Sequence, residues 1–115
     1  MTVVTYTDAQ LLSDFRDLFR LTLDEVEATG ISRSTWARIE QGLETSHRPG
    51  VEKRLHVIRL LMQQIGQMPY RDAREWAVQP LPRRTKSPRD LVTSSLFGLN
   101  TLLRHLAAQH DFVVS

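Results

Sequence analysis

Four polar side chains, at the start and on the outward face of one short predicted helix, offer the chemistry of nucleic-acid contact. They are Arg33, Ser34, Thr35 and Arg38. An arginine can donate two hydrogen bonds to the edge of a guanine, and serine or threonine hydroxyls can bond to phosphates. We therefore predict a DNA-binding surface at these positions. The alternative is that they are exposed polar positions on a helix whose role is structural.

The other residues capable of catalysis or metal binding are scattered. The four histidines, His47, His56, His105 and His110, do not pair with a second ligand at the spacing of a metal site. The sequence also lacks an HExxH pattern, a glycine-rich phosphate loop and a nucleophile elbow. We therefore expect no enzymatic activity, no metal and no cofactor.

A helix-turn-helix over residues 21–42 would position the four polar side chains. Thr22 and Glu25 have the spacing of a capping box, which marks a helix start. Gly30 can adopt the left-handed backbone that ends such a helix, and Ser32 can cap the second one. Apolar residues at helical spacing predict the buried side of the second helix: Trp36, Ile39 and Leu43. In helix-turn-helix proteins this second helix lies in the major groove.

The distribution of charge does not favour DNA contact by this half of the chain. Residues 1–47 contain four basic and eight acidic residues, so their net charge is −4. Residues 48–115 contain eleven basic and five acidic residues, which gives +6. DNA-binding surfaces are usually positive because they neutralise phosphates. Glu27 also replaces a small apolar residue of the usual motif, and the segment 26–30 is one residue shorter than usual.

Apolar periodicity predicts further helices on both sides of this motif. The expected helices cover residues 8–20, 51–68, 70–78 and 96–110, with one more beginning at Ser87. Thr7 or Asp8 would cap the first, and Pro69 would stop the long second one. That long helix is either an ordinary core helix or a dimer seam. Residues 1–6 are expected to form a loose arm or a short strand, and residues 43–50 a loop.

Length and composition bound the class of protein. A chain of 115 residues that is 41% hydrophobic can form one packed domain, or two very small ones that share a core. It contains no cysteine, which excludes disulfides and thiolate metal sites. The N-terminus does not read as a signal peptide, and no apolar run approaches the roughly 20 residues that span a bilayer. We expect a cytoplasmic protein without a membrane partner.

The C-terminal third carries residues in the order found in a known domain. Trp76 is followed by Pro80, a basic loop, the segment SPRDLV at 87–92, and Gly98 before an apolar final helix. This order resembles the Xre–MbcA–ParS toxin-binding domain, which is found in antitoxins behind an Xre-type helix-turn-helix. The resemblance covers about residues 20–115. The basic link PRRTKSPRD departs from the family, which commonly has a glycine before its proline.

The resemblance implies the antitoxin of a type II toxin–antitoxin pair. Such antitoxins are not catalytic; they obstruct the active site of an NAD-consuming toxin with a RES fold, and many repress their own operon. With the apolar end of the chain, this points to the following toxin-binding residues: Trp76, Arg83, Arg84, Lys86, Arg89, Leu102, Leu103, Leu106, Phe112, Val113, Val114 and Ser115. The tail at 112–115 either packs on the chain's own core or inserts into the partner. The loop 83–89 meets an acidic rim of the partner, DNA phosphates or water.

We therefore predict an all-α protein with two regions. Residues 1–68 form a helix-turn-helix domain with the long helix, and residues 69–115 form the toxin-binding domain. The predicted partners are a RES-domain toxin and operator DNA, in a homodimer or a larger complex with the toxin. One alternative is a stand-alone Xre-type transcriptional repressor. Another is a helical scaffold whose helix-turn-helix only dimerises the protein.

Overall fold

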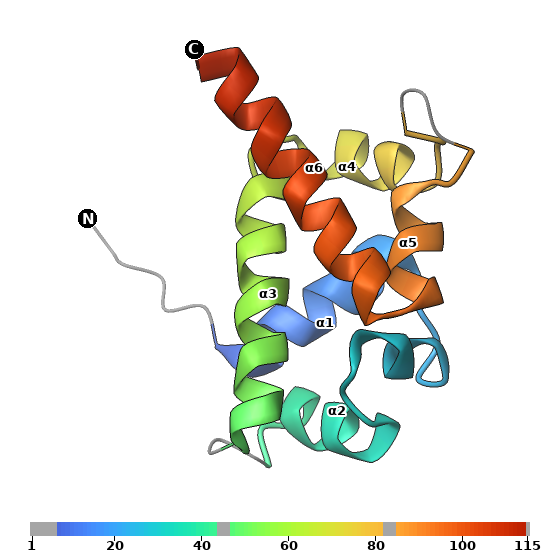
Figure 1. Ribbon diagram of the computed structural model, residues 1–115. Helices are drawn as coiled ribbons and strands as arrows, with labels where there is room; N and C mark the ends of the chain where they lie inside the picture. Colours follow the sequence, from blue (N-terminus) through green and yellow to red (C-terminus); the bar gives the residue numbers. More distant parts are fainter. Residues whose placement is uncertain (1–6, 44–46, 82–84, 115) are drawn as a thin grey trace.

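The computed structural model describes residues 7–43, 47–81 and 85–114, and at positions 96, 107 and 109–114 it describes only the backbone of the last helix. All regular structure in these ranges is helical, which confirms the predicted all-α fold. The elements are α1 (Asp8–Phe19), the 3₁₀ helix η1 (Glu25–Thr29), α2 (Arg33–Glu40), α3 (Pro49–Ile65), α4 (Tyr70–Ala77), α5 (Pro88–Ser94) and α6 (Leu96–Val114) (Figure 1). The predicted arm at 1–6 and part of the predicted loop, 44–46, lie outside the described residues.

Helix α1 begins and ends with local signals. The Thr7 hydroxyl accepts a hydrogen bond from the Gln10 N–H at 3.1 Å, as predicted for its cap. At the other end Arg20 adopts a left-handed backbone with φ of 53°, and its N–H bonds to carbonyls of the last turn. The predicted apolar stripe is confirmed, because five residues of α1 are buried: Leu11, Leu12, Phe15, Leu18 and Phe19.

The segment between α1 and α2 differs from the expected helix. The Thr22–Glu25 capping box forms, with hydrogen bonds of 3.0 and 3.2 Å. It opens a single 3₁₀ turn of five residues instead of an α-helix, and Gly30 ends this turn with φ of 92°. Ser32 then caps α2, as predicted.

The buried side of α2 is confirmed at Trp36 and Ile39 but is wrong at Leu43. Helix α2 ends at Glu40, and the chain turns at Gly42 with a left-handed backbone. Because the helical periodicity stops there, Leu43 no longer shares the buried face, and 73% of its surface is exposed.

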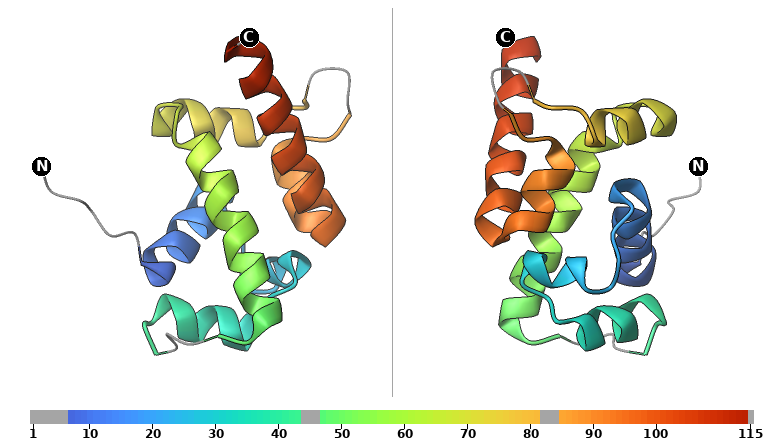
Figure 2. Two further views of the ribbon diagram at one scale, coloured as in Figure 1. Left: turned by 60° about the vertical axis from the view of Figure 1, so that its left-hand side comes forward. Right: turned by 90° about the vertical axis from the view of Figure 1, so that its right-hand side faces the viewer.

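Two long helices, α3 and α6, lie side by side, and the shorter elements pack around them. In Figures 1 and 2, α2 lies near the beginning of α3 and α4 near its end, while α1 crosses behind α3. Helix α5 contacts both α6 and η1. Helix α3 ends at Ile65, where Gly66 caps it, so the predicted stop at Pro69 is a few residues late.

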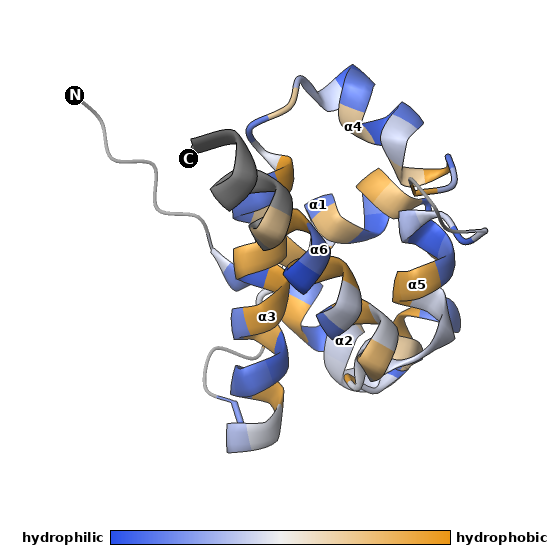
Figure 3. Cartoon of the chain, turned by 45° about the horizontal axis from the view of Figure 1, so that its top comes forward, coloured by the Kyte–Doolittle hydropathy of each residue, from blue (hydrophilic) through white to orange (hydrophobic). Residues whose placement is uncertain are grey.

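A single core joins the two predicted regions. Its largest fully buried side chain is Trp36. The ring centroids of Trp36 and Phe15 lie 5.9 Å apart, and those of Phe15 and Phe19 lie 5.0 Å apart. Leu99 and Leu102 of α6 belong to the same buried cluster. Figure 3 shows apolar and polar residues alternating along α3 and α5, as expected for helices with one buried side. The C-terminal third therefore packs on the first two thirds.

None of the helices in the described ranges is both long and apolar enough to cross a membrane.

Candidate functional site

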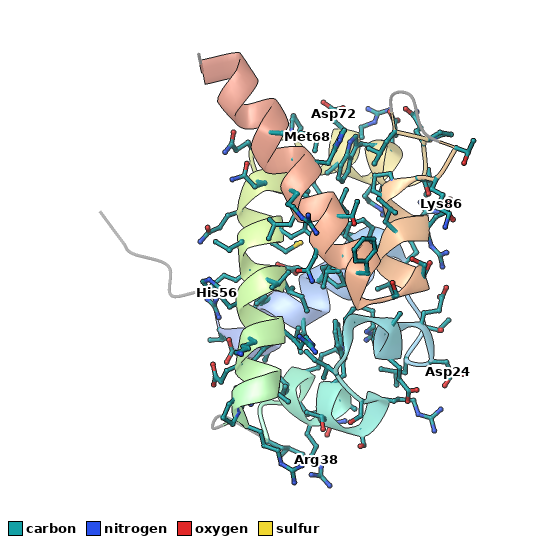
Figure 4. All side chains as sticks on the ribbon, viewed as in Figure 1. Asp24, Arg38, His56, Met68, Asp72 and Lys86 are labelled. Carbon is teal, nitrogen blue, oxygen red and sulfur yellow. The ribbon has the colours of Figure 1, made fainter. Side chains whose placement is uncertain are left out.

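Helix α2 presents three of the four predicted DNA-binding residues to solvent. Arg33, Ser34 and Arg38 are exposed, and Thr35 is half-buried. The Thr35 N–H donates to the Ser32 hydroxyl at 3.3 Å, which fixes the start of the helix. In Figure 4 the Arg38 side chain points outward from the lower end of the molecule. The structure thus brings these residues together on one surface.

Not all of these side chains are equally available. Arg33 Nη1 lies 2.6 Å from Asp24 Oδ1, in an ion pair that is exposed on both sides. The Thr35 hydroxyl accepts a hydrogen bond from Ser32 at 2.9 Å. For Arg38, no ion pair or hydrogen bond from its side chain is found in the described part of the chain. Arg38 is therefore the most available cation on this helix.

An ion pair holds the back of α2 against α1. Arg16 donates from Nε to Glu40 Oε1 at 2.9 Å and from Nη2 to Glu40 Oε2 at 3.0 Å. The hydrogen bond to Glu40 raises the pKa of Arg16 above its usual value. Only 13% of the Glu40 side chain is exposed, so solvent screens this pair less than a surface pair. This ion pair therefore fixes the position of α2, and of its exposed face, relative to α1.

Sequence spacing did not reveal one basic neighbour of the turn before α2. Arg54 of α3 packs against Gly30, because a Cβ at Gly30 would lie 3.1 Å from Arg54 Cδ and overlap with its Nε. Arg48 and Lys53 are exposed near the same end of α3. No local pattern announces this contact, since residues 30 and 54 meet only through the fold.

Arg89 is engaged within the chain, although the sequence analysis assigned it to a partner. Its Nε donates to the Phe19 carbonyl at 2.9 Å, and its Nη2 donates to the two carboxylate oxygens of Glu25 at 2.8 and 3.0 Å. Hydrogen bonds from the Thr22 backbone and then from Arg89 hold the pKa of Glu25 below its usual range. Arg89 thus ties α5 to the end of α1 and to η1.

The residues around Arg89 serve the same local structure. Ser87 and Asp90 form a reciprocal capping box, with hydrogen bonds of 3.0 and 3.2 Å. The Ser87 backbone N–H lowers the pKa of Asp90. Pro88 occupies the first turn and is buried. The predicted start of this helix is confirmed, and the segment SPRD is largely accounted for by folding.

The other predicted toxin-binding residues divide between core and surface. Leu102 is fully buried and Leu106 nearly so, in the core formed with α3, so neither is offered to a partner in this fold. Trp76 and Leu103 are half-buried, and Lys86 is exposed. Arg83, Arg84 and Ser115 lie outside the described residues, as do the side chains of Phe112, Val113 and Val114. The backbone of α6 continues to Val114, and its last turns project beyond the other helices (Figure 1).

Among the described residues of the C-terminal third, the structure exposes two large apolar side chains that were not predicted as binding residues, Val78 and, more fully, Phe97. Phe97, in the first turn of α6, is 72% exposed. It precedes Gly98, where α5 and α6 approach closely enough that a Cβ would lie 2.9 Å from the Leu91 carbonyl carbon. Phe97 lies off the buried side of this helix, which includes Leu99, Leu102 and Leu106. An exposed phenylalanine is a candidate anchor for a protein partner.

An apolar cavity of about 550 Å³ opens between α1, the end of α3 and α4. Its apolar lining includes Leu11, Leu18, Met62, Ile65, Met68 and Ala73. Two hydrogen bonds link α1 to the other helices around this cavity. Arg59 of α3 donates to Asp8, and the Tyr70 hydroxyl of α4 donates to Asp17. Among the described residues, no group of three or more histidine, aspartate or glutamate side chains is placed to hold a metal ion.

A comparison of the chain with protein families, curated proteins and solved structures finds no match in any of the three.

Proposed function

We propose that this protein is an antitoxin that binds a RES-domain, NAD-consuming toxin through its C-terminal third and blocks the toxin's active site. The proposal comes from the resemblance of about residues 20–115 to antitoxins with an Xre-type helix-turn-helix and an Xre–MbcA–ParS toxin-binding domain, the latter over residues 69–115. On this proposal the protein is not an enzyme; it acts in the cytoplasm by covering a partner's catalytic site.

The observation that supports it best is the corner between α5 and α6. One part of the pattern that carries the resemblance, from Ser87 to Gly98, folds there as one local structure: the Ser87–Asp90 capping box, buried Pro88, and Gly98 against the Leu91 carbonyl. Phe97 stands exposed beside this corner.

The toxin would be blocked by the exposed surface of α5 and α6. Phe97 supplies an apolar anchor, and Lys86 supplies a cation near the start of α5. The last turns of α6 project far enough to enter a cleft of the partner (Figure 2). The buried residues Leu102 and Leu106 act indirectly, because they fix α6 on the core.

Co-expression with the product of the neighbouring reading frame tests this proposal. The wild-type chain should restore growth, and Phe97→Asp should restore less. Leu43→Asp is the matched control, because Leu43 is as exposed as Phe97 but lies at the end of α2. Deletion of residues 111–115 should also weaken rescue. A neighbouring product that is harmless when expressed alone, or full rescue by both altered chains, would contradict the proposal.

DNA binding by α2 is a second candidate function, either for autoregulation or for a stand-alone repressor. It is favoured by the exposed Arg38, which has no ion-pair partner among the described residues, on a capped helix that Glu40 holds against α1. A mobility-shift assay with the protein's own promoter should detect a complex that weakens steeply with salt. Arg38→Ala should weaken it, whereas Arg71→Ala, an exposed change on α4, should not. The absence of a shift at low salt would rule this function out.

A further inference from the structure

Two adjacent carboxylates hold arginines from both candidate surfaces. Asp24 binds Arg33, the first residue of α2, at 2.6 Å. Glu25 binds Arg89 of α5 at 2.8 Å. The DNA-binding candidate and the toxin-binding candidate are therefore anchored at neighbouring positions of the chain, although 56 residues separate the two arginines. In Figure 4 Asp24 lies at the edge of the molecule, on the side away from α3.

Of the two ion pairs, the one between Glu25 and Arg89 is the stronger. The Glu25 carboxylate also accepts the Thr22 N–H at 3.0 Å, and Arg89 also donates to the Phe19 carbonyl. Arg89 and Glu25 are each about 30% exposed, whereas Arg33 and Asp24 are mostly exposed. Charge-assisted hydrogen bonds shielded from solvent contribute more than exposed ion pairs. Arg89 therefore fixes where η1 begins.

The position of η1 determines where α2 starts. Three residues separate the two elements, and the middle one, Ile31, is 1% exposed. Val26 and Thr29 of η1 are buried, and Ser32 provides the cap of α2. So short and anchored a link cannot absorb a large shift of η1 without moving the first turn of α2.

We propose that Arg89 is a positioning residue that couples the α5–α6 corner to α2 through Glu25, η1 and Asp24. A protein partner that engages Arg89 takes it from Glu25 and loosens the start of α2; a phosphate that engages Arg33 takes it from Asp24 at the same place. Coupling of this kind is reciprocal. The regulatory consequence rests on the proposed function, because it assumes a partner at α5, but the mechanical link belongs to the chain alone.

Amide hydrogen exchange of the isolated chain, followed by NMR, tests the link without any partner. In Arg89→Gln, exchange at Trp36 and Ile39 of α2 should accelerate about fivefold more than exchange at Ile58 and Leu61 of α3. Lys86→Gln removes the same charge from an exposed side chain and should change neither helix. Equal acceleration in α2 and α3, or none in α2, would overturn the coupling.

Two further variants keep the test decisive if Arg89→Gln does not fold. Glu25→Gln removes the charge from the other partner and should loosen α2 in the same way. Arg89→Lys retains the charge but not the fork that reaches the Phe19 carbonyl and Glu25 together, so α2 should show a smaller acceleration. When Arg89→Gln and Glu25→Gln are combined, the amides of α2 should exchange no faster than in the faster of the two single variants. If the accelerations of the two single variants add, the proposal is overturned. Because no toxin or DNA is present, these outcomes do not depend on the co-expression result.

Discussion

Replacement of Gly98 by alanine tests the close approach of α5 and α6. A Cβ at this position would lie 2.8 Å from the Ser94 hydroxyl oxygen and 2.9 Å from the Leu91 carbonyl carbon, and closer still to the Leu91 oxygen. To bring the Leu91 oxygen, the nearest of these atoms, to an ordinary contact of about 3.5 Å, α5 and α6 must separate by more than about 1 Å. A gap of about 0.5–1 Å already forfeits a quarter to a half of the dispersion energy between the separated atoms.

The magnitude follows from two opposing terms. Overpacking of this kind costs about 1–3 kcal/mol, and the backbone contact places Gly98→Ala at the upper end. The better helix propensity of alanine returns up to about 1 kcal/mol. The net loss is about 2 kcal/mol, which lowers the midpoint of thermal unfolding by about 8 °C for a chain of this length.

Urea and thermal unfolding, monitored by circular dichroism, would measure this loss. Gly50→Ala is the matched control, because it also lies in a helix but a Cβ there meets nothing within 4 Å. The control should be neutral or stabilised by up to about 1 kcal/mol. If Gly98→Ala is as stable as the wild type, the close packing of α5 on α6 is refuted.

Three other outcomes are expected. Glu40→Gln should cost about 1–2 kcal/mol in urea unfolding, and a double-mutant cycle with Arg16→Gln should show that most of this cost is shared. The folded protein lowers the pKa of Glu25, so the contribution of Glu25 to stability is complete above its unfolded pKa and is lost as pH falls through its folded pKa. Glu25→Gln should therefore flatten the dependence of unfolding free energy on pH in that acidic range. An unchanged slope would contradict the contact of Glu25 with Thr22 and Arg89. Trp36→Phe should cost much less than the roughly 3–5 kcal/mol of Trp36→Ala, because the buried indole N–H has no hydrogen-bond partner among the described residues; equal costs by calorimetry would refute this.

Features set by neighbouring residues were readable from the sequence. Thr7, Ser32 and Ser87 each cap a helix, as predicted, because a cap needs only a hydroxyl and an N–H three residues later. Gly30 adopts the left-handed backbone for a similarly local reason. Apolar periodicity also predicted α1, α3 and α6 without knowledge of what they pack against, and each of them has buried apolar residues.

Features that depend on distant residues were not readable. Arg89 looked like an exposed cation in a basic link, and its role is set by Glu25 and by a carbonyl 70 residues earlier. Leu102 was assigned to a partner because an apolar helix face does not say whether its cover is the same chain or another. Phe97 went unnoticed because it falls off the apolar stripe, which is the reason it stays exposed. The site is thus less predictable than the fold.

The contact between Arg89 and the end of α1 also determines when folding can be completed during synthesis. The carbonyl of Phe19 and the carboxylate of Glu25 leave the ribosome long before their partner does. Until α5 emerges, η1 lacks an element that packs on it. The first half of the chain is therefore not a finished unit on its own. A product truncated before residue 89 would expose apolar surface and be open to proteases.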